Sequence, residues 1–199
     1  MALKPPFYGH PAAMPWQRTP ITAVIIGVAV LVALATDQGR GELSLWLYII
    51  NPVTGEQDVW RWLSPAFLHY GWLHLVFNCL WLFAVGRLIE WRSGSAFILV
   101  FLASALAGNA LQWFMGDWRF GGLSGVVYGV VGYVWLWDRL RADKYAVPPV
   151  YLGISLFFLL IGFANLDGIL GVNMANGAHL GGLLGGLAVA LLHAVVEKR

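Results

Sequence analysis

One stretch of the sequence decides how this chain folds: residues 121–138, which read GGLSGVVYGVVGYVWLWD. A helix that begins at Ser124 and stops just before Asp138 is about 21 Å long, whereas the hydrocarbon core of a bilayer is about 30 Å thick. If Asp138 lies at one membrane surface, Ser124 lies roughly 10 Å below the other. The backbone before Ser124 then enters the membrane as irregular chain, which is tolerated only where protein buries it or water fills a cavity. The sequence therefore predicts a water-filled pocket with Ser124 at its floor.

The composition also indicates a membrane protein. The chain has 199 residues, of which 59% are hydrophobic and 11% are charged, and it contains 24 glycines and 11 tryptophans. A soluble domain has about 25% charged residues and an apolar fraction near one half, so a water-soluble fold is excluded. Disorder, a coiled coil and nucleic-acid binding all require more charge than this chain has. The single cysteine, Cys79, excludes an intrachain disulfide framework and a Cys-rich zinc site.

Charged residues divide the chain into uncharged stretches, each able to hold one spanning helix of about 20 residues. The expected helices are residues 21–36, 72–89, 93–114, 124–137, 149–165 and 176–196. We therefore expect an all-α polytopic membrane protein, with a six-helix bundle at 21–199 and a cytoplasmic tail at 1–20. The large outer loop at 37–71 has two Trp-rich apolar segments, 43–50 and 59–68, which we expect to lie in the membrane interface.

Lys and Arg set the orientation of the bundle, because cytoplasmic connections carry an excess of them. Three of these residues fall on one side: Arg40, Arg61 and Arg119. Nine fall on the other: Lys4, Arg18, Arg87, Arg92, Arg139, Arg141, Lys144, Lys198 and Arg199. Both termini are therefore expected in the cytoplasm. Residues 33–35 resemble a signal cleavage site, but the proline-rich segment before the first span is a poor signal n-region, so we expect that span to stay uncleaved.

Ser124 is the candidate nucleophile of the expected pocket. A serine at a helix start is ordinarily an N-cap, and that interpretation is strong for a serine taken alone. Here Gly121, Gly122 and Gly125 surround Ser124 and let another chain approach its hydroxyl. A helix N-terminus also offers N–H groups and a positive dipole end to a developing oxyanion. The stretch is not a hydrolase nucleophile elbow, which needs a glycine where Val126 stands.

His179 is the candidate base. His179, Gly182 and Gly186 share one face of the last helix, because they stand at i, i+3 and i+7. Small residues at such spacing let membrane helices pack closely, which would bring His179 to the equally small face of the fourth helix. A purely structural glycine zipper is the alternative. Gly181 is expected to fall one position round the helix, off the His179 face.

Two further groups lie near the expected depth of Ser124. His74 and Asn78 stand at i and i+4 on the second helix, at a depth that matches Ser124 to within about 2 Å. Tyr128 follows Ser124 by one turn and could stack beneath a histidine ring, with core packing as the alternative. No carboxylate is placed to complete a triad, which favours a Ser–His dyad.

These motifs, in this order, resemble the rhomboid intramembrane serine proteases, most closely the bacterial GlpG type, from about residue 40 onward. The matching residues are Trp60-Arg61, His69, His74, Asn78, Gly122-Leu123-Ser124-Gly125, Tyr128, Ala178-His179, Gly182 and Gly186. The resemblance implies that Ser124 is the nucleophile and His179 the general base. It also implies that the Ser124 N–H, His74 and Asn78 bind the oxyanion, and that Tyr128 supports the His179 ring. Gly122, Gly182 and Asn176 would support the site.

The resemblance further implies an endopeptidase that cleaves transmembrane segments of other proteins, with no cofactor and no metal. The fifth helix and the loop 166–175 would admit a substrate from the side. The expected location is the bacterial inner membrane, with the active site facing the periplasm. Expected partners are transmembrane substrates and the lipid bilayer, not nucleic acid, and the oligomeric state is left open.

Two other functions compete with this interpretation. A metalloprotease would use His69, His74 and His179, but no Glu or Asp adjoins any of them, unlike the usual zinc-protease motif. A catalytically inactive rhomboid-like factor would bind membrane clients, but such proteins lack the serine or the histidine, and both are present here. A transporter is not a third candidate, because it would need charged residues within its spans, which this chain lacks.

Overall fold

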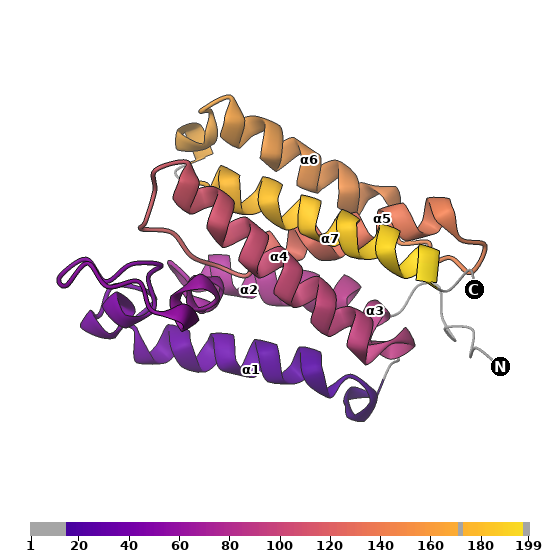
Figure 1. Cartoon of the computed structure of the whole chain (residues 1–199), viewed down its shortest axis with the longest axis horizontal. Helices are drawn as coiled ribbons and strands as arrows, with labels where there is room; N and C mark the ends of the chain where they lie inside the picture. Colours follow the sequence, from indigo (N-terminus) through magenta and orange to yellow (C-terminus); the bar gives the residue numbers. More distant parts are fainter. Residues whose placement is uncertain (1–14, 171–172, 197–199) are drawn as a thin grey trace.

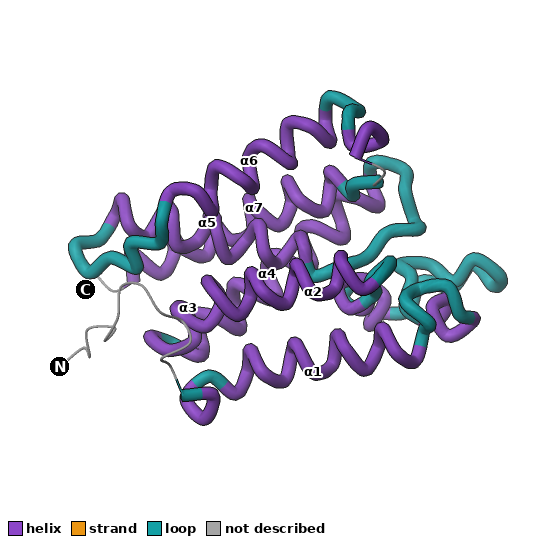
Figure 2. Tube along the Cα trace, turned by 180° about the vertical axis from the view of Figure 1, so that it is seen from behind, coloured by secondary structure: helices purple, strands orange, loops and turns teal. Residues whose placement is uncertain are grey.

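The computed structural model of the chain describes residues 15–170 and 173–196, and no strand occurs among them (Figures 1 and 2). Its α-helices are α1 Pro20–Ala35, α2 Trp72–Trp81, α3 Arg87–Arg92, α4 Gly94–Phe114, α5 Ser124–Leu140, α6 Pro149–Phe163 and α7 Asn176–Val196. A π-helical segment, Leu82–Gly86, joins α2 to α3, so that these elements form one rod. Most of the expected cytoplasmic tail, residues 1–14, lies outside the described residues.

The helices occupy the expected stretches, with differences at their ends. The second rod continues to Arg92, and α5 continues to Leu140, three residues beyond the expected end. The charge of Asp138 does not stop α5, because its carboxylate accepts hydrogen bonds from the Tyr145 and Ala146 N–H groups of the following loop. Helix α6 ends two residues early, at Phe163.

Within the described part of the chain, three rods are long and apolar enough to cross a membrane: Trp72–Arg92, Gly94–Phe114 and Asn176–Val196. Helices α1 and α6 are apolar but shorter. These lengths and compositions fit a multi-pass membrane protein. The count of six crossings and the cytoplasmic position of both termini stay predictions.

Helix α7 packs against both α4 and α5, and glycines line both contacts. A Cβ on Gly182 would overlap the Gly125 carbonyl of α5. A Cβ on Gly181 would overlap the Ala107 carbonyl of α4. Gly181 therefore lies off the His179 face, as expected, but it packs against α4, so a side chain at Gly181 would also disturb the bundle.

Buried charges hold the start of α1 against α3. The Glu90 carboxylate accepts hydrogen bonds from the Ile21 N–H at 2.6 Å and the Thr22 N–H at 2.8 Å. It also accepts one from the Thr22 hydroxyl, while Arg87 Nε donates to the Thr19 hydroxyl at 2.9 Å. A carboxylate at a helix N-terminus is stabilised by the free N–H groups and the dipole. This contact fixes α1 to the second rod.

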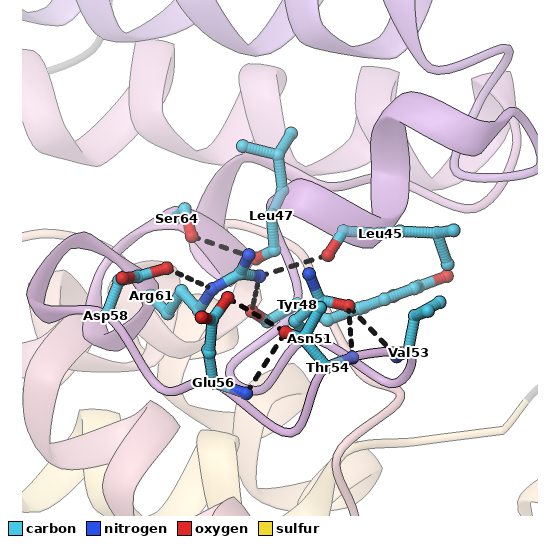
Figure 3. Close-up of polar contacts among 10 residues, drawn as sticks. All are labelled: Leu45, Leu47, Tyr48, Asn51, Val53, Thr54, Glu56, Asp58, Arg61 and Ser64. Carbon is cyan, nitrogen blue, oxygen red and sulfur yellow. Dashed lines mark hydrogen bonds and ion pairs between the residues drawn. The ribbon is translucent and has the colours of Figure 1, made fainter.

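The outer loop between α1 and α2 is folded around a buried arginine (Figure 3). Arg61 is fully buried, its Nε donates to Asp58 at 3.0 Å, and its Nη1 donates to the Leu45 and Tyr48 carbonyls at 3.0 Å. Trp46 and Trp60, from the two apolar segments, stay exposed. The loop is therefore a compact cap, and its seat in the membrane interface stays a prediction.

Candidate active site

The structure brings Ser124 and His179 together from two helices. His179 Nε2 lies 2.9 Å from Ser124 Oγ. The N-cap of α5 is Leu123, and Ser124 is the first helical residue, so Ser124 is not the N-cap of this helix. Its hydroxyl is free to face His179, and Ser124 remains half-buried while His179 is buried. The close packing of Gly182 on Gly125 sets this approach, because each glycine lies beside or one turn from a member of the pair.

Tyr128 lies against the other side of the histidine ring. The Tyr128 and His179 rings are stacked, with centroids 4.5 Å apart and planes 14° apart. The Tyr128 hydroxyl donates to the Ser155 carbonyl of α6 at 2.8 Å. The stack and the hydrogen bond thus fix the position of the Tyr128 ring, and this ring restricts the orientation of His179.

His179 Nδ1 is buried and has no hydrogen-bond partner among the described residues. The carboxylates of two nearby loops are engaged in other hydrogen bonds. Asp117 accepts from the Gln112 amide and the Arg119 N–H, and Asp167 accepts from the Met174 N–H. The arrangement is a Ser–His pair in which no described carboxylate binds the histidine.

His74 and Asn78 lie against the backbone that leads into Ser124. Gly122 has φ +126°, and a Cβ there would lie 2.6 Å from His74 Cε1 and 2.7 Å from its Nε2. The same Cβ would lie 3.7 Å from Asn78 Nδ2. Only glycine fits this position. Because Gly122 has no side chain, the side chains of His74 and Asn78 can lie beside the irregular backbone. Asn78 Nδ2 also donates to the His74 carbonyl at 3.1 Å, which links the two residues.

His69 has a role in this backbone that the sequence did not reveal. It is fully buried, with Nδ1 donating to the Phe67 carbonyl at 3.0 Å and Nε2 accepting from the Leu123 N–H at 3.3 Å. Burial, with a smaller contribution from His74, lowers the pKa of His69 to about 3. A neutral His69 therefore pairs with the buried backbone just before Ser124. The signal that points to it is a histidine close in sequence to a stretch whose buried N–H groups need partners.

Asn176, which is expected to support the site, lies against helix α6. It begins α7, and its side chain packs against Gly162 of α6, where a Cβ would overlap Oδ1. Asn176 Oδ1 has no hydrogen-bond partner within the described part of the chain. Its support of the site stays a prediction.

The described residues include no group of three or more His, Cys, Asp or Glu placed to hold a metal ion. Both ring nitrogens of His69 are already hydrogen-bonded, so His69 has none to spare for a ligand. A hollow of about 270 Å³ lies instead in the outer loops, lined by residues that include Arg40, Tyr48, Trp118 and Arg119. The water-filled pocket above Ser124 stays a prediction, which the partial exposure of Ser124 and His74 supports.

The fold and the site define a class: a helical membrane protein in which glycine-packed helices bring a serine and a histidine together. The sequence model of one protein family, described as Rhomboid domain, matches residues 56–195. The chain belongs to the rhomboid family, as the motifs predicted. The match includes every helix from α2 onward, except the last residue of α7, and every residue of the site described above. Assignment to the GlpG type within the family stays a prediction.

Proposed function

We propose that this chain is an intramembrane serine endopeptidase in which Ser124 is the nucleophile and His179 the general base. The observation that carries the proposal is the 2.9 Å separation of His179 Nε2 and Ser124 Oγ. A serine hydroxyl is a weak nucleophile unless an adjacent base takes its proton, and this distance is within hydrogen-bond reach. With the proton on Nδ1, Nε2 accepts the Ser124 proton as Oγ attacks the scissile carbonyl.

The attack creates an oxyanion that must be stabilised by hydrogen-bond donors. The Ser124 N–H belongs to the first turn of α5, where N–H groups have no partner within the helix. His74 and Asn78 lie against Gly122, two residues before Ser124, and they supply side-chain donors. Donors fixed in advance at the developing charge are commonly the largest contribution to such catalysis.

The proton on His179 then passes to the leaving amine, and the peptide bond breaks to leave an ester on Ser124. Water, activated by the same histidine, attacks the ester and releases the second product. Tyr128 keeps the histidine ring in one orientation through both steps, because the two rings are stacked at 4.5 Å. The chemistry needs no bound cofactor.

The substrate class follows from the location of the site. A membrane protein with its reactive serine at the start of a helix can reach peptide bonds in or near spans of other membrane proteins. We expect entry past α6 and the loop 166–175, because α6 is the least buried of the long helices near the site. The Lys and Arg distribution supports an opening on the side away from the cytoplasm. The family resemblance supports a bacterial inner membrane, so that this side is the periplasm.

An inactive, client-binding member of the family is the alternative function. Both catalytic residue types are present and within bonding distance, which favours the enzyme. The experiment is cleavage of a single-span reporter in lipid vesicles by the wild type and by Ser124→Ala and His179→Ala. We expect each variant to lose cleavage about as fully as the other, since nucleophile and base act as a unit. Binding of the reporter without any cleavage by the wild type would favour the alternative.

A further inference from the structure

Helix α6 is attached loosely to the bundle. It lies at the outer edge in both views (Figures 1 and 2), and only Ser155 and Gly162 along its length are buried. Large apolar side chains on its other faces, such as Phe157 and Leu160, are exposed. Its position therefore depends on a few contacts.

Those few contacts include one hydrogen bond. Among the described residues, the bond from the Tyr128 hydroxyl to the Ser155 carbonyl is the one hydrogen bond that joins α6 to another long helix. Edge contacts between aromatic rings, Trp81 with Tyr151 and Phe77 with Phe158, join α6 to α2. Gly162 meets Asn176 by packing alone, since Asn176 Oδ1 has no donor there.

Tyr128 therefore has two attachments that differ in kind. Its ring is stacked on His179, and its hydroxyl holds α6. The Ser155 side chain does not compete for this bond, because its own hydroxyl donates to the Tyr151 carbonyl at 3.0 Å. If α6 moves outward, the buried phenol loses its acceptor, and an unpaired buried hydroxyl is unfavourable.

We propose that the Tyr128 hydroxyl is a latch that ties the position of α6 to the histidine of the site. The proposal rests on the proposed protease function for what passes α6, and it makes Tyr128 a positioning residue with a second task. In the closed position of α6, which the structure shows, Tyr128 both donates to the Ser155 carbonyl and stacks on His179. Outward movement of α6, as a substrate span enters, breaks the bond and frees the tyrosine ring.

The test compares two variants that each remove one hydroxyl from α5. Tyr128→Phe removes the bond to α6 and keeps an aromatic ring. Tyr133→Phe is the matched control, because its hydroxyl lies 2.7 Å from Nδ1 of His193, which belongs to α7. Amide hydrogen exchange of residues 149–163 is measured on the full chain in lipid nanodiscs. A helix α6 that is released from the bundle loses contacts that limit its local unfolding, so its amides exchange faster.

We expect Tyr128→Phe to raise exchange in α6 about fivefold, the factor that corresponds to one net hydrogen bond. The control should exchange in α6 as the wild type does. For a transmembrane substrate, KM should fall by up to the same factor in Tyr128→Phe, because the binding-competent open state is more populated. If the hydroxyl had only a structural role, Tyr128→Phe would raise KM or lower kcat instead.

Unchanged exchange of α6 in Tyr128→Phe would overturn the latch, as would equal acceleration by both variants. The exchange measurement needs no catalysis, so its result separates the latch from the protease function. A wild type that cleaves nothing would contradict the proposed function alone, whereas an active wild type with unaltered α6 exchange in Tyr128→Phe would contradict the latch alone.

Discussion

The backbone of Gly182 lies directly on the backbone of Gly125, so closely that a single methyl group on Gly182 would overlap the Gly125 carbonyl. Gly182 stands almost one turn after His179 in α7, and Gly125 follows Ser124 in α5. The distance between the nucleophile and the base is therefore set by a contact of two residues that have no side chains.

The first prediction concerns that contact. Gly182→Ala should reduce covalent reaction at Ser124 by about 10²-fold, because a displacement near 1 Å at a reacting pair has that size of effect. The added Cβ would meet backbone atoms of Gly125, which cannot move aside as a flexible side chain can. Labelling by a fluorophosphonate is measured beside thermal stability. Gly27→Ala is the control, since a Cβ there meets nothing within 4 Å. Full labelling of Gly182→Ala would show that the glycine contact does not position His179.

The second prediction concerns the oxyanion donors. His74→Ala and Asn78→Ala should each lower kcat by about 10²–10³-fold, the usual effect of losing one donor. Cleavage should not vanish, because the Ser124 N–H remains. Turnover of a single-span reporter measures the effect. Normal turnover in both variants would show that His74 and Asn78 only pack on α2 and do not bind the oxyanion.

The third prediction is a pH dependence of stability. Burial lowers the pKa of His69 from 6.5 to about 3. Between these two pH values, His69 is therefore protonated in the unfolded chain and neutral in the folded chain. The free energy of unfolding should therefore fall as the pH drops below about 6.5, and this contribution is fully present above that pH. The Tm of the wild type should drop more between about pH 7.5 and pH 5 than the Tm of His69→Gln. Equal drops would argue against a neutral buried His69.

The fourth prediction is the topology. In a Cys79→Ala background, a cysteine at Val53 in the outer loop should react with an impermeant thiol reagent added to intact cells. Both this position and Ala142, between α5 and α6, are exposed. Ala142→Cys should react only after the membrane is permeabilised, since the Lys and Arg excess lies on its side. The reverse pattern would place the opening of the site in the cytoplasm.

The positions of the helices were predictable because membrane spans need long uncharged stretches, and the charged residues mark their limits. The end of α5 was not, because Asp138 is satisfied by backbone N–H groups of a loop that only the folded chain brings near. The pairing of Ser124 with His179 also followed from the sequence, through the spacing of small residues on α7.

The sequence missed contacts that depend on a third element. Gly181 packs against α4, which the helical face of His179 alone could not indicate. His69 pairs with the Leu123 N–H, although 54 residues separate them in the chain. Asn176 meets Gly162, which belongs to another helix, α6. Each of these contacts comes from long-range packing, which periodicity within one helix does not encode.

Covalent labelling of Ser124 tests the central claim most directly. The full chain in lipid is treated with a fluorophosphonate, and the modified residue is identified by mass spectrometry in the wild type, Ser124→Ala and His179→Ala. If His179 activates Ser124 across 2.9 Å, the wild type should carry one phosphonyl group on Ser124 and both variants should carry none. A wild type that remains unmodified, or a His179→Ala variant labelled at the wild-type rate, would contradict the account.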